Sequence, residues 1–73
     1  MRRILLRTPT GEVYYATNGA GEGLFVRLPY ESAYKQLLGT CQTPVFRTPQ
    51  QFRRWLRRHL GIKGRILSTW GWD

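Results

Sequence analysis

Apolar and polar residues alternate along the first part of the chain, which is the pattern of half-buried β-strands. Residues 2–7 (RRILLR) alternate strictly enough to predict one strand, and residues 12–17 (EVYYAT) are rich in β-branched and aromatic side chains that favour a second. Between them, the proline and glycine of residues 8–11 (TPTG) predict a tight turn. Residues 18–23 (NGAGEG) are typical of a loop, and residues 24–28 (LFVRL) predict a third strand.

The spacing of apolar residues changes after residue 28. Apolar side chains recur three and four residues apart, which predicts a short helix over residues 29–39 that ends at Gly39. The stripe consists of Tyr30, Ala33, Tyr34, Leu37 and Leu38. Residues 43–47 (TPVFR) predict a short extended segment, and residues 64–69 (GRILST) a final strand.

A second helix is predicted between Thr48 and Gly61 by its end signals. Thr48 is an N-cap residue, Pro49 suits the first helical position, and Gln51 can reach back to the cap. Gly61 stands where a left-handed C-cap belongs, and Ile62 can fold back toward the last turn. The apolar face comprises Phe52, Trp55, Leu56, His59 and Leu60. We therefore expect one α+β domain over residues 1–73: a small antiparallel β-sheet of three to four strands with one or two short helices packed on it.

Charge and composition restrict the function further. The 73 residues include 12 Lys and Arg but only 4 Asp and Glu, for a net charge of +8, while 41% are hydrophobic, which predicts a folded domain that meets an acidic partner. The lone Cys41 excludes an intrachain disulfide, and without a Cys/His cluster no metal is expected. The N-terminus has neither a signal peptide nor a membrane span, so a cytoplasmic setting is the default.

Candidate catalytic chemistry is sparse. His59 lies on the edge of an apolar helix face, where packing or capping is expected, and Cys41 is expected to be a small, partly buried side chain. The glycines of residues 18–23 match no phosphate-binding motif. We expect no enzyme, no cofactor and no small-molecule substrate.

The second helix has four arginines, Arg53, Arg54, Arg57 and Arg58, opposite its apolar face, and no acidic residue three or four positions away neutralises them. Guanidinium groups suit bidentate contacts with carboxylate or phosphate, so the partner is a nucleic acid or an acidic protein surface, unless the face is only solvated. A membrane surface is disfavoured because the core needs the apolar face of this helix.

The aromatic residues leave two alternatives open. Tyr14 and Phe25, beside Arg7 and Arg27 on one sheet face, could stack bases, or helices could cover that face. Trp70 and Trp72 could form a protein-binding hot spot or close the core.

The chain as a whole resembles the small transcription regulators of lytic bacteriophages that bind host bacterial RNA polymerase. The resemblance rests on the chain length, the excess of basic over acidic residues, the layout of MRRILLRTPTGEVYY and the arginine helix QQFRRWLRRHL. It implies binding to the largest polymerase subunits near the RNA exit channel, displacement of σ factor and suppression of termination. The alternative is a small basic protein that binds RNA or DNA directly. From surface reasoning, the expected partner-binding residues are Arg2, Arg3, Arg53, Arg54, Arg57, Arg58, Lys63 and Trp72.

Overall fold

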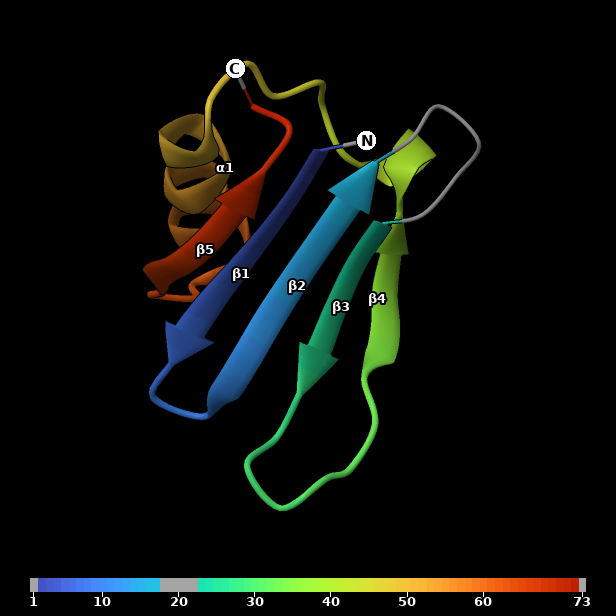
Figure 1. The fold of residues 1–73 in the computed structure, drawn as a ribbon, viewed down its shortest axis with the longest axis vertical. Coiled ribbons are helices and arrows are strands. Elements are labelled where there is room, and N and C mark those ends of the chain that lie inside the picture. The colour runs from blue at the N-terminus through green and yellow to red at the C-terminus, as the bar shows by residue number, and fades with distance from the viewer. Residues whose placement is uncertain (1, 18–22, 73) are drawn as a thin grey trace.

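A computed structural model describes residues 2–17 and 23–72, and within them five strands form one antiparallel sheet in the order β4-β3-β2-β1-β5 (Figure 1). The strands are β1 (Arg2–Thr8), β2 (Gly11–Thr17), β3 (Gly23–Arg27), β4 (Lys35–Gly39) and β5 (Arg65–Trp70). The α+β class is confirmed, but the expected number of three to four strands is too low.

The hairpin of β1 and β2 forms as the alternation predicts. Ile4 pairs with Tyr15 and Leu6 with Val13, so these four side chains share one face of the sheet. Gly11 begins β2 with a φ of 140°, and a side chain there would collide with the carbonyl oxygen of a residue in β3. Only glycine fits the end of this turn.

After β4 the chain forms a short 3-10 turn, η1 (Thr40–Gln42), and then the single longer helix of the described residues. It consists of α1 (Pro49–Trp55) and a continuing π-helical turn, η2 (Leu56–Leu60), and it lies at the β5 side of the sheet (Figure 1). Its predicted ends are confirmed: the Thr48 hydroxyl accepts from the Gln51 N–H at 3.2 Å, and Gly61 is left-handed with a φ of 67°. The Gln51 side chain accepts instead from the Arg47 N–H at 2.8 Å, one residue before the cap.

The core lies between the helix and one face of the sheet. Phe52 is fully buried, its ring stacked on Tyr15 with centroids 4.7 Å apart and edge-on to Phe46 at 5.2 Å. The full buried cluster comprises Ile4, Leu6, Val13, Tyr15, Leu24, Phe46, Phe52 and Leu56. In the described part of the chain the helix packs on that face only, and we call the opposite face, where Tyr14 and Phe25 are half-buried, the open face.

The helix predicted over residues 29–39 is wrong. A turn, closed by the Glu31 N–H donating to the Leu28 carbonyl at 3.0 Å, leads into β4, which pairs antiparallel with β3. An isolated short helix is marginal in water, whereas β3 offered an unpaired edge whose backbone groups β4 satisfies. The expected apolar stripe is largely solvent-exposed, with Tyr30 84% and Leu37 47% accessible.

The segment of residues 43–47 does not form a strand; it delivers the buried Phe46 to the core between η1 and α1. The predicted final strand forms as β5 and pairs with β1 at the end of the sheet opposite β4. No helix formed by residues 2–17 and 23–72 is long and apolar enough to cross a membrane.

Candidate binding surfaces

The outer side of the helix forms the first candidate surface. Its arginines point away from the core because Phe52 and Leu56 fix the opposite side of the helix against the sheet. A groove of about 330 Å³, hereafter the helix groove, is lined by Gln50, Arg53, Arg54, Arg57, Lys63 and Gly64. The Arg53 Nε donates to the Gly64 carbonyl at 2.9 Å, which ties the helix to the segment that leads into β5.

The helix groove is strongly cationic. Within the described residues, the side chains of Arg54, Arg57 and Lys63 form no hydrogen bond and no ion pair. The two described glutamates pair elsewhere, because Glu12 binds Arg27 at 2.8 Å and Glu31 binds Lys35 at 3.0 Å. The four expected residues Arg53, Arg54, Arg57 and Lys63 are thus brought together with their charges largely uncompensated.

The end of the helix departs from the predicted apolar face. Leu56 is buried, but Leu60 is 37% exposed and His59 lies at the surface. The π-helical turn is wider than an α-turn, so the residues after Leu56 shift off the line of the buried stripe. The His59 ring stacks on Trp55 with centroids 5.1 Å apart, and its Nδ1 lies 3.3 Å from the Trp55 carbonyl oxygen, contacts that fit the expected packing or capping. Arg58 is exposed nearby without lining the helix groove.

Three of the expected partner-binding residues meet at the chain termini. The Arg2 guanidinium donates to the Phe46 carbonyl at 2.9 Å and lies 5.5 Å from the centre of the Trp72 ring. The Trp72 Nε1 donates to the Arg3 carbonyl at 2.6 Å. Arg2 and Trp72 therefore fasten the end of the chain to β1, and they do not belong to the helix groove. The exposed Cys41 in η1 contradicts its expected partial burial.

The open face of the sheet forms the second candidate surface. The rings of Tyr14, Phe25 and Tyr34 cluster there: Tyr14 lies 6.1 Å from Phe25 and 5.9 Å from Tyr34, measured between centroids. Of the two alternatives for Tyr14 and Phe25, the structure favours an uncovered face, since the helix packs against the other one. Tyr34 was missed because the sequence pattern assigned it to a helix.

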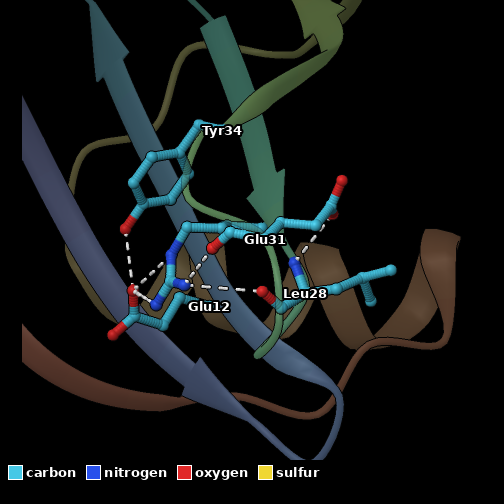
Figure 2. Close-up of polar contacts among 5 residues, drawn as sticks. Glu12, Leu28, Glu31 and Tyr34 are labelled. Atoms are coloured by element: carbon cyan, nitrogen blue, oxygen red, sulfur yellow. Dashed lines mark hydrogen bonds and ion pairs between the residues drawn. The ribbon is translucent and has the colours of Figure 1, made fainter.

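A polar network holds Tyr34 over the open face (Figure 2). The Glu12 carboxylate accepts from Arg27 Nη2 at 2.8 Å and from the Tyr34 hydroxyl at 2.9 Å, while Arg27 Nη1 donates to the Glu31 carbonyl at 2.8 Å. The hydrogen bonds from Arg27, then Tyr34, lower the pKa of Glu12, and the hydrogen bond from Lys35 lowers the pKa of Glu31. Burial, then the bond to Glu12, raises the pKa of Tyr34. Glu12 and Arg27 are directly opposite each other on β2 and β3, a pairing that the sequence pattern alone does not give.

No protein-family model, no curated protein and no solved structure matches this chain.

Proposed function

We propose that this chain is a phage-encoded transcription regulator that binds host bacterial RNA polymerase, inhibits initiation by displacing σ factor and suppresses termination. The observation that supports the proposal is the helix groove, where Arg53, Arg54, Arg57 and Lys63 converge without acidic partners in the described part of the chain. The resemblance to small phage regulators supplies the identity of the partner.

An acidic protein surface satisfies the chemistry of this groove. Arginine is weakly hydrated and forms planar pairs of hydrogen bonds with carboxylates, so it suits contacts from which water is excluded. The mutual repulsion of these arginines is relieved when carboxylates of a partner enter the groove. The positive field around the chain also accelerates encounter with an acidic partner. We place that partner on the largest polymerase subunits, near the RNA exit channel.

Complex formation with nuclease-treated bacterial core RNA polymerase on a sizing column tests the proposal. We expect a stoichiometric complex that forms less readily as the ionic strength rises, because the exposed charges are screened. Competition with σ factor and a termination assay then measure the two regulatory effects. A well-folded chain that never co-elutes with the polymerase would refute the proposal and favour direct nucleic-acid binding.

A further inference from the structure

The open sheet face combines aromatic rings that the core does not use. Tyr14 and Phe25 are directly opposite each other on β2 and β3, and Leu5 lies opposite Tyr14 on β1. Neither ring belongs to the buried cluster, and Tyr34, which leans on Tyr14, is 39% exposed. Adjacent strands are about 4.8 Å apart, so these side chains form a continuous apolar platform.

A row of cations borders this platform. Arg65, Arg7, Glu12 and Arg27 lie side by side across β5, β1, β2 and β3. Glu12 and Arg27 neutralise each other, whereas the exposed Arg7 and Arg65 form no hydrogen bond and no ion pair among residues 2–17 and 23–72. The row is two residues along the strands from the rings, a separation of about 7 Å.

We propose that the open sheet face binds a single-stranded nucleic acid, with bases stacked on Tyr14, Phe25 and Tyr34 and phosphates bound by Arg7 and Arg65. A nucleotide whose base lies on the rings has its phosphate within reach of these long side chains. At the other end of the face Trp70, 47% exposed and opposite Arg3 on β1, offers a further stacking surface.

The observations favour a single strand over other occupants. Flat rings beside cations match a ligand whose units each contain a π-face and a negative charge, which is the composition of unpaired nucleotides. Duplex DNA hides the faces of its bases and would use only the arginines. An acidic protein would pair with the arginines and leave the platform without a specific partner. This surface faces away from the side of the sheet that the helix covers, so the binding is independent of the polymerase contact proposed above.

The direct test is fluorescence anisotropy of labelled oligouridine and oligothymidine. A length of about 12 nucleotides is suitable, because single-strand-binding OB-folds cover about 4–16 nucleotides each. The purified full chain is used without polymerase, so the result does not depend on the proposed function. We expect Tyr14→Leu or Phe25→Leu to weaken binding by about tenfold, since stacking contributes about 1–3 kcal/mol per base. Thermal denaturation checks that each variant is folded.

The salt dependence gives a second readout that does not disturb the aromatic platform. A double variant, Arg7→Gln with Arg65→Gln, is expected to reduce the slope of log K against log salt by about 1.4, because each phosphate contact to a single strand contributes about 0.7. The matched control, Arg54→Gln with Arg58→Gln on the helix, is expected to leave both affinity and slope unchanged. It removes the same charge from the other surface.

Several outcomes decide the proposal. Tighter binding of oligouridine than of oligothymidine supports an RNA ligand, and equal binding supports recognition of bases and phosphates alone. The proposal is overturned if neither oligonucleotide binds at low salt, if duplex DNA competes as well as a single strand, or if only the helix variant loses affinity. Loss of polymerase binding in the sheet variants, with no oligonucleotide binding by the wild type, would instead make this face a protein-docking surface.

Discussion

Phe52 is the side chain through which the helix packs on the sheet, and its replacement gives the most direct test of the fold. The ring is fully buried and contacts both Tyr15 of β2 and Phe46 of the preceding segment. We consider two changes, Phe52→Leu, which keeps most of the apolar volume, and Phe52→Ala, which leaves a cavity.

The expected losses differ by a factor of about two. Phe52→Leu removes two aromatic pairs worth about 0.5–1.5 kcal/mol each, so we expect a decrease of about 1–3 kcal/mol in the free energy of unfolding. Phe52→Ala is expected to remove about 3–5 kcal/mol. A chain of 73 residues has a total stability of about 4–11 kcal/mol, so the alanine variant comes close to unfolding.

Thermal denaturation followed by circular dichroism measures both variants. A loss of 2 kcal/mol in a domain of this size lowers the Tm by about 8–16 °C. The control is Arg54→Ala on the exposed side of the same helix, which is expected to change stability by no more than about 0.5 kcal/mol. If Phe52→Leu has the same Tm as that control, the aromatic cluster does not hold the helix on the sheet and the prediction is refuted.

Three further predictions address the surfaces and the ends of the helix. Charge reversal at Arg54 and Arg58 is expected to weaken polymerase binding by more than about tenfold while the Tm barely changes; undiminished co-elution would place the contact elsewhere. The hydrogen bond from Arg27 lowers the folded-state pKa of Glu12. The ionised Glu12 therefore stabilises the fold fully above the ordinary glutamate pKa of about 4.3, and this stabilisation is lost as the pH falls through the lower folded-state pKa. Wild type should therefore lose stability below about pH 4.3 more steeply than Glu12→Gln, and parallel pH profiles would contradict this. Thr48→Ala removes the N-cap acceptor and should cost about 1 kcal/mol by urea denaturation, whereas Thr48→Ser should not; equal losses would show that the cap is not the cause.

The elements that the sequence predicted correctly are those with local causes. The hairpin of β1 and β2 follows from alternation and from a turn that only Gly11 can complete. The helix begins at the Thr48 cap and ends at the left-handed Gly61, because both residues act on backbone groups only a few positions away. The arginines of the helix were likewise placed correctly on its outer side.

The wrong predictions concern residues whose environment comes from distant parts of the chain. Residues 35–39 have helical spacing, yet they pair with β3 because that strand has a free edge, which no local pattern records. Tyr34 therefore joins the open face instead of a helix stripe. Arg2 and Trp72, 70 positions apart in the sequence, contact each other only because β5 pairs with β1.

The sequence by itself determined the α+β class, the first hairpin, the ends of the arginine helix and the strong positive charge, since short-range geometry and composition are sufficient for each. Only the tertiary structure decided which sheet face the helix covers and which cations converge around Lys63. It also decided that the rings of Tyr14, Phe25 and Tyr34 cluster on the sheet face opposite the helix. The physical reason is that burial and strand pairing depend on contacts between residues far apart in the chain, whereas propensities and caps act within one or two turns.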